Sequence, residues 1–171
     1  NNTPRQINIL EALGAPRPVY AHLPMINGTD GKKLSKRHGA ISVLEYEKEG
    51  ILPQALLNYL VRLGWSHGDQ EIFSLEEMIA NFDIDDVNKS AGCFDPDKLK
   101  WVNQQYIQAM PTDELAAAAA PFFAGIGADL TQGPPLGEVV NALRERAQTL
   151  VELAERGAPY YMDVSEFEAQ A

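Results

Sequence analysis

The stretch Lys32-Lys33-Leu34-Ser35-Lys36-Arg37-His38 contains four of the seven Lys and Arg residues found among the first fifty positions. The turn Asn27-Gly28-Thr29-Asp30-Gly31 precedes it and Gly39 follows it, so the stretch is expected to form a cationic loop. Lysine ammonium groups and the planar arginine fork both bind phosphate, and the Ser35 hydroxyl can donate or accept a hydrogen bond. On composition alone, however, such a run is more often solvated surface, and it lacks the glycine spacing of a Walker motif.

The composition around this stretch describes a chain that folds in a reducing compartment. Its 171 residues are 45% hydrophobic, enough for one ordinary domain or two small ones. We expect no membrane association, because no apolar run is long enough to span a bilayer, and the first residues do not resemble a secretory signal. The single Cys93 excludes an internal disulfide and a cysteine-based zinc site, and it is expected to be a small buried residue. These features favour a cytoplasmic location.

The charge of the chain is strongly uneven. The net charge is −10, yet residues 1–50 sum to +2, residues 51–100 to −5 and residues 101–171 to −7. An acidic chain is a poor general ligand for nucleic acid, because neutralisation of phosphates supplies most of that affinity. Any contact with nucleic acid should therefore be local, and residues 32–38 are the strongest candidate. The acidic remainder is interpreted as a solvated helical surface.

Upstream of the cationic stretch, the sequence predicts a helix and then a strand. Thr3-Pro4-Arg5-Gln6 has the residue types of a capped helix start, and Gly14 is a helix stop. Val19 to Ile26 is predicted as a short strand, with Pro24 at its edge or end.

Downstream of it, capping signals and apolar spacing predict mainly helices. Ser42 and Glu45 form one capping-box pattern, whose helix should end at Gly50, and Ser74 and Glu77 form another. A third helix starts at Pro53 and ends at Gly64. In the helix that starts at Pro53, the expected core positions are Leu56, Leu57, Leu60, Val61 and Leu63. In the helix that starts after Ser74, they are Leu75, Met78, Ile79 and Phe82.

Beyond residue 94, the pattern remains helical. Asp95-Pro96 should begin a helix that Pro111 ends, and a domain boundary is placed near Pro111. Pro121 is expected to interrupt the alanine-rich segment that follows. One long helix is predicted over residues 136–156. The expected fold is therefore mainly α with a small α/β start.

Hydrolytic and metal-dependent chemistry find little support in the sequence. There is no Gly-x-Ser-x-Gly pattern, and no two of the three histidines have the helical spacing of a zinc site. The acidic run from Asp83 to Asp86 lacks the glycine and the later glutamate of a calcium loop, so it is interpreted as an exposed link. No metal site within the chain is predicted.

Lys33-Leu34-Ser35-Lys36-Arg37 resembles the KMSKS loop of class I aminoacyl-tRNA synthetases, in its KLSKR form. The flanking sequences resemble bacterial glutamyl-tRNA synthetases over essentially the whole chain, most closely over residues 3–107. They include Thr3-Pro4-Arg5-Gln6, Ala21-His22-Leu23-Pro24, Lys36-Arg37-His38-Gly39-Ala40, Leu52-Pro53-Gln54-Ala55-Leu56-Leu57-Asn58-Tyr59-Leu60, Leu63-Gly64-Trp65 and Phe94-Asp95-Pro96-Asp97-Lys98-Leu99-Lys100-Trp101.

This resemblance implies a two-step ligation. Glutamate attacks the α-phosphate of ATP, which enters with Mg²⁺, and the terminal hydroxyl of tRNA(Glu) then attacks the acyl carbon. The resemblance assigns Lys36 the chief catalytic role, stabilising the departing pyrophosphate, with Lys33 and Ser35 assisting at the phosphates. Arg37 is implied as a further ATP contact, and Met25 and Ile26 as adenine contacts through their backbone. A monomeric enzyme is expected.

The other signature of the family, the HIGH motif, has no counterpart among these residues, since no His-x-Gly-His occurs. The resemblance therefore implies a piece of the enzyme, expected to be inactive alone. Its implied parts are the end of a Rossmann-type catalytic domain (1–40), a stem-contact region (41–110) and the first helices of an all-α anticodon-binding domain (111–171).

Two questions stay open in the sequence. The resemblance suggests a tRNA-facing surface in the middle region, whereas Trp101 could equally be core and the lysines merely exposed. A non-catalytic helical module that binds tRNA or a protein partner, and a glutaminyl or non-discriminating relative, are the alternative functions. The proposed tRNA-facing residues are Lys89, Lys98, Lys100, Trp101, Asn103 and Gln104.

Overall fold

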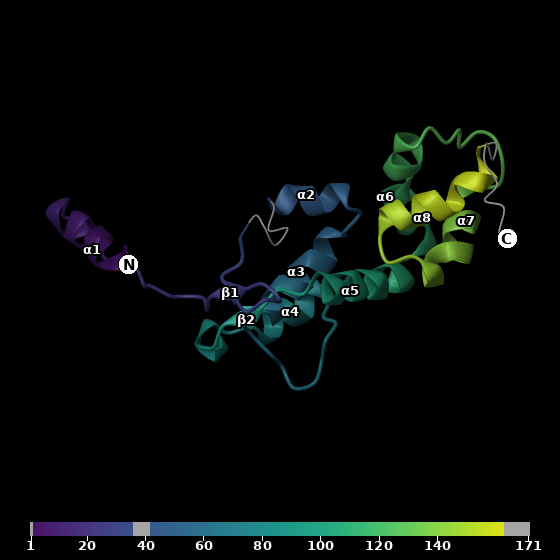
Figure 1. The fold of residues 1–171 in the computed structure, drawn as a ribbon. Helices are drawn as coiled ribbons and strands as arrows, with labels where there is room; N and C mark the ends of the chain where they lie inside the picture. Colours follow the sequence, from purple (N-terminus) through teal and green to yellow (C-terminus); the bar gives the residue numbers. More distant parts are fainter. Residues whose placement is uncertain (1, 36–41, 163–171) are drawn as a thin grey trace.

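The computed structural model describes residues 2–35 and 42–162, and the described residues are mainly helical with one two-stranded sheet (Figure 1). This confirms the predicted fold class. The helices are α1 (Thr3–Ala12), α2 (Val43–Lys48), α3 (Pro53–Arg62), α4 (Leu75–Asn81), α5 (Pro96–Ala109), α6 (Thr112–Gly125), α7 (Leu136–Leu143) and α8 (Leu150–Gly157). The strands are β1 (Ile26–Asn27) and β2 (Gly92–Cys93), and the short 3₁₀ turns are η2 (Ile84–Asp86), η3 (Arg144–Arg146) and η4 (Ala158–Tyr160).

Helix α1 forms where the sequence predicts it but stands apart from the rest of the described chain (Figure 1). Its N-cap is Asn2 rather than Thr3, and Gly14 follows its end with a φ of +63°, a conformation that glycine adopts without strain. Among the described residues, none of α1 is buried, and Leu13 at its end is 74% exposed. Its apolar side chains therefore contribute nothing to the described core.

The predicted strand over Val19–Ile26 is wrong. Only Ile26 and Asn27 form β1, which pairs in parallel with β2, Ile26 opposite Gly92 and Asn27 opposite Cys93. The preceding segment from residue 15 to residue 25 is extended but irregular. Alternating residue types favour a strand only where a second strand is available to pair, and here the pairing begins after Pro24, which has no N–H to donate.

The central core forms where α3 packs against α5. Both helices begin with a proline in the first turn, as predicted, and the side chain of Asp95 caps α5 by accepting from the N–H groups of Asp97 and Lys98. The buried face of α3 carries Leu56 and Tyr59, whereas Leu57 and Leu60 are 46% and 40% exposed. The prediction of one continuous apolar core face on α3 is thus only partly right.

Helix α4 has the predicted capping box but not the predicted core face. The N–H of Glu77 donates to Ser74 Oγ at 3.1 Å, and the N–H of Ser74 donates to the Glu77 carboxylate at 2.7 Å. Of the four expected core residues only Met78 is buried, in a small cluster with Trp65 and Phe73. The exposed ones are Leu75, Ile79 and Phe82. By contrast, the Ser42 side chain makes no capping hydrogen bond to α2.

The C-terminal helices α6, α7 and α8 pack against one another, and their core is continuous with that of α3 and α5. Helix α6 runs through Pro121 without a break in its assigned helix, so the predicted interruption is wrong. The predicted single helix over residues 136–156 is also wrong, because residues 147–149 separate α7 and η3 from α8. Thr149 caps α8 by accepting from the N–H of Glu152, and this cap fixes the break.

Arg144 closes the C-terminal end of α5. Its guanidinium donates to the carbonyl of Ile107 through Nε at 3.2 Å and through Nη2 at 2.6 Å, and Nη2 also donates to the carbonyl of Met110. These oxygens lie at the end of a helix, where no intrahelical donor is available and a positive charge is favoured. Arg144 therefore joins α5 to the C-terminal helices.

We expect Arg144→Ala to lower the free energy of unfolding by about 2 kcal/mol, because the helix-end carbonyls lose a charged donor. Arg146→Ala is the matched control. That arginine lies in the same 3₁₀ turn but is exposed, so a change within about 0.5 kcal/mol is expected. Urea-induced unfolding of both variants and the wild type measures the difference. Equal losses in the two variants would contradict a specific role for Arg144.

Candidate functional site

The KMSKS-like stretch is described up to Ser35. Lys36 and Arg37 lie outside the described residues, so their predicted roles stay predictions. Lys33 and Ser35 are described: Lys33 is exposed and Ser35 is half-buried. The structure therefore describes the residues that lead up to Ser35 and, from Ser42 onward, the segment that follows the signature.

A tight turn brings the chain from β1 into the signature. The N–H of Gly28 donates to the carbonyl of Lys32 at 2.8 Å, and the N–H of Leu34 donates to the carbonyl of Ile26 at 2.9 Å. Gly31 has a φ of +75°, and the Asp30 carboxylate accepts from the N–H of Lys32 at 2.9 Å. The turn thus folds Lys33 back beside Asn27 in an antiparallel bridge.

Strand β2 fixes the other side of β1. The carbonyl of Met25 accepts from the N–H of Gly92 at 2.9 Å, and the carbonyl of Asn27 accepts from the N–H of Phe94 at 2.7 Å. The carbonyls of Met25 and Ile26 are therefore engaged in the sheet and the turn. Met25 is 53% exposed at its side chain, while Ile26 packs against the core. Their implied contact with adenine stays a prediction.

Cys93 of β2 is exposed, so its prediction as a small buried residue is wrong. Its thiol lies 3.5 Å from the carbonyl of Gly28, within reach of a weak hydrogen bond. The side chain therefore reaches the turn from β2 instead of turning into the core.

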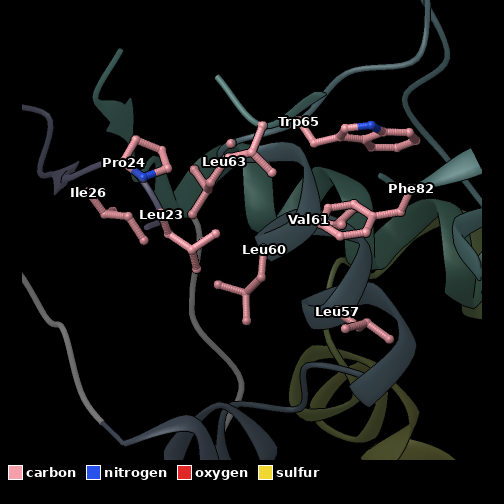
Figure 2. A pocket seen from close by; sticks show the side chains of 11 residues that line it. Leu23, Pro24, Ile26, Leu57, Leu60, Val61, Leu63, Trp65 and Phe82 are labelled. Atoms are coloured by element: carbon pink, nitrogen blue, oxygen red, sulfur yellow. The ribbon is translucent and has the colours of Figure 1, made fainter. Parts of the chain in front are cut away.

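An apolar groove of about 250 Å³ lies between the segment before the signature and α3. Figure 2 shows Leu23, Pro24 and Ile26 on one side, facing side chains of α3 and the aromatic rings of Trp65 and Phe82. This groove explains why Leu57 and Leu60 are exposed despite their helical apolar spacing. The sequence pattern identified these side chains as apolar but could not show that they line a groove.

A charged cluster lies on the other side of α3. The Glu71 carboxylate contacts Arg62 at 3.4 Å and Lys98 at 3.1 Å. The Lys98 ammonium, which donates to Glu71, lowers the pKa of that carboxyl from its ordinary value, although both side chains are about two-fifths exposed, at 41% and 40%. Sequence reasoning missed Arg62 and Glu71, because the pairing joins α3 to a loop nine residues on.

Some of the proposed tRNA-facing residues are accessible at the surface, and others are engaged within the fold. Lys89 is exposed and Lys100 is half-buried, so both can reach a partner. The Lys98 ammonium lies 3.9 Å from the centre of the Trp101 ring, a cation–π contact, and Trp101 packs against the core. Gln104 donates to the carbonyl of Glu145 at 3.2 Å. Asn103 is completely buried, so its predicted contact with tRNA is wrong.

Residues 2–35 and 42–162 contain no group of three or more His, Cys, Asp or Glu side chains placed to hold a metal ion. None of the helices in these ranges is both long and apolar enough to cross a bilayer.

Residues 1–101 match the family model described as tRNA synthetases class I (E and Q), catalytic domain. The match covers the turn, the signature stretch, the parallel β1–β2 pair, helices α1–α4 and the start of α5, which places them in a class I tRNA synthetase. Because it spans more than half of the 171 residues, the chain belongs to the E and Q family of these synthetases.

Two solved structures extend the likeness over almost the whole chain. A glutamate tRNA ligase from Elizabethkingia meningosepticum, crystallised in complex with its amino acid, is 29% identical, with a TM-score of 0.76 over 98% of this chain. A glutamate-tRNA synthetase from Elizabethkingia anophelis is 28% identical, with a TM-score of 0.76 over 98% of this chain. In both cases the match covers 38% of the relative, so this chain spans about two-fifths of their length.

Proposed function

We propose that this chain is part of a glutamate–tRNA ligase, which activates glutamate with ATP and transfers it to tRNA(Glu). The observation that carries the proposal is the match of 98% of the chain to a glutamate tRNA ligase crystallised with its amino acid. The family alone leaves glutamate and glutamine open, and the structural relatives favour glutamate. The KLSKR form of the signature supports ATP as the co-substrate.

The described residues suit a nucleotide phosphate at the turn. Lys32 and Lys33 are exposed where the chain returns from the turn, so their ammonium groups are accessible to an anion. The Ser35 hydroxyl follows two residues later. In the proposed mechanism Lys33 and Ser35 hold the phosphates and Lys36 stabilises the charge that develops on pyrophosphate. Arg37 adds a further cation, and Mg²⁺ arrives bound to the ATP phosphates.

The proposal also concerns tRNA. Lys89 and Lys100 remain candidates for contact with the tRNA backbone, because both reach the surface of the middle region. Lys98 is a weaker candidate, since Glu71 already neutralises its charge. The implied division into residues 1–40, 41–110 and 111–171, the cytoplasmic location and the monomeric state belong to the same proposal.

The test is glutamate-dependent exchange between ATP and pyrophosphate, followed by charging of tRNA. We expect the full-length protein that contains this chain to catalyse exchange between ATP and pyrophosphate when glutamate is present, but not when glutamine replaces it. We also expect it to charge tRNA(Glu). Charging of tRNA(Gln) with glutamate at a similar rate would show a non-discriminating relative instead. The 171-residue chain alone should show no exchange above buffer, because it contains no His-x-Gly-His motif. Measurable exchange by the isolated chain would overturn that expectation.

A further inference from the structure

Asn103 of α5 lies between the residues that follow α2 and those that precede α8. Its side chain is fully buried, and every polar group on it has a partner. Its Oδ1 accepts from the N–H of Leu52 at 2.8 Å, and its Nδ2 donates to the carbonyl of Gly50 at 3.2 Å and to that of Gln148 at 2.7 Å. One N–H and two carbonyls allow only this orientation of the amide, so Asn103 is fixed in place.

Gly50, which follows α2, takes part in the same contact among α2, α5 and α8, here called the junction. Its carbonyl also accepts from the N–H of Leu150, the first residue of α8, at 3.0 Å. The backbones approach so closely that a Cβ on Gly50 would lie 2.6 Å from the nitrogen of Val151. The end of α2 is therefore pressed directly against the start of α8, with Asn103 holding both.

Helix α2 is also tied to the sheet beside the signature. The ring of Tyr46, its buried residue, lies 6.1 Å from the ring of Phe94. Phe94 follows β2 and donates its N–H to Asn27 in β1.

Tyr59 of α3 binds the backbone of Asp95, at the start of α5. Its hydroxyl accepts from the N–H of Asp95 at 2.7 Å and donates to the carbonyl of Asp95 at 3.0 Å. Burial raises the pKa of Tyr59 to about 12, so this donor stays protonated.

The described residues on both sides of the signature stretch are thus held by one set of connected elements, β1, β2, α2 and α5, which form the frame of the signature. The entering flank is held by β1 through Leu34 and Ile26. The leaving flank is α2, which is held by Phe94 and, through Gly50, by Asn103. Because α5 carries Asn103 and begins directly after Phe94 and Asp95, it connects the two flanks with each other and with α8.

We propose that Asn103 is a positioning residue for the ligation reaction: through Gly50 and Gln148 it couples the helices α6–α8 to α2, and so holds α2, which follows the signature in the chain, relative to β1. Asn103 touches no substrate and acts through the backbone of α2. The inference rests on the proposed function for its consequence in catalysis, whereas the junction itself can be tested without activity.

The first test is hydrogen exchange in the full-length protein carrying Asn103→Asp. The carboxyl group has nearly the same shape and still accepts from Leu52, but it cannot donate to both carbonyls, because an ionised carboxylate has no donor and a protonated one has a single O–H. We expect amides of α2 and of residues 50–52 to exchange about tenfold faster, as loss of buried donors weakens local stability. In kinetic assays, kcat/KM for ATP in pyrophosphate exchange should fall about tenfold, since small misplacements of catalytic groups are costly.

Asn58→Asp is the matched control. Asn58 is the other fully buried asparagine among the described residues, and it too accepts from a backbone N–H, that of Phe73, and donates to a carbonyl, that of Glu71. It does not contact α2 or α8 through these bonds. Its variant should lose stability, yet exchange in α2 and kcat/KM for ATP should change less than twofold relative to the wild type.

The outcomes separate the junction from the proposed function. Equal effects of the two aspartate variants on α2 would show that Asn103 is merely structural and would overturn the inference. If the wild-type protein shows no exchange of pyrophosphate, the proposed function fails, while hydrogen exchange still decides the junction. Should Asn103→Asp not fold, Asn103→Ser retains one donor and is expected to show a smaller effect confined to the same segments; an unchanged α2 in that folded variant would also contradict the proposal.

Discussion

Replacing Lys36 with alanine in the full-length protein is expected to slow glutamyl-adenylate formation by about a hundredfold or more, which corresponds to about 3 kcal/mol of lost transition-state stabilisation. The reason is electrostatic. Negative charge builds on pyrophosphate as its bond to the α-phosphate breaks, and a preorganised ammonium group stabilises that charge more than it stabilises bound ATP. The loss should therefore appear mainly in kcat, with a smaller change in KM for ATP.

The control for Lys36 must separate a specific role from the loss of one positive charge. Lys48→Ala removes the same charge from the exposed last turn of α2, and its rate should stay within twofold of wild type. Lys36→Arg keeps the charge but replaces a compact ammonium by a planar fork, so an intermediate rate is expected. Single-turnover measurement of adenylate formation distinguishes these results, and an unchanged rate in Lys36→Ala would remove Lys36 from the mechanism.

Local signals in the sequence predicted where most helices begin. The capping box of Ser74 and Glu77 forms as expected, and Asp95 caps α5, because a cap depends only on residues a few positions apart. Long-range packing was much harder to predict. The apolar spacing of α3 fits a helix, but the structure buries Tyr59 and leaves Leu57 beside a groove, and spacing alone does not say what covers a face.

The break in the predicted helix over residues 136–156 has the same origin. Leu143 and Leu150 fit one helical stripe, yet Thr149 caps a new helix and the carbonyl of Gln148 bonds to Asn103, 45 residues earlier. The prediction rested on the regular apolar spacing and did not use the capping pattern of Thr149 and Glu152, which stand three residues apart. The partner that stabilises the break could not be identified without the fold.

For the candidate site, the sequence provided the signature but not its frame. The residues of the KLSKR stretch are contiguous, whereas the frame joins β1, β2, α2 and α5, which meet only after folding. Asn103 was named among the residues that could contact tRNA. Its four-residue spacing from Leu99 and from Ile107, both buried, places it on the apolar face of α5, and a lone amide on such a face indicates a buried hydrogen-bonding role.

Replacing Gly50 with alanine is expected to lower the free energy of unfolding by about 3 kcal/mol or more. Two effects add. Gly50 has a φ of +75°, where an L-residue with a Cβ is strained by about 1–2 kcal/mol. In addition, the new Cβ would lie 2.7 Å from the nitrogen of Leu150 and 2.6 Å from that of Val151, and these are backbone atoms that cannot rotate away. The start of α8 must therefore move.

Gly68→Ala isolates the first effect from the second. Gly68 also has a positive φ, +55°, but a Cβ there would meet nothing within 4 Å, so only the conformational cost of about 1 kcal/mol should remain. Thermal or urea-induced unfolding of the two variants measures the difference. A loss in Gly50→Ala no larger than that in Gly68→Ala would mean that α2 and α8 can separate at little cost. That result would weaken the coupling of the C-terminal helices to the signature, because Gly50 is the point at which α2 and α8 touch.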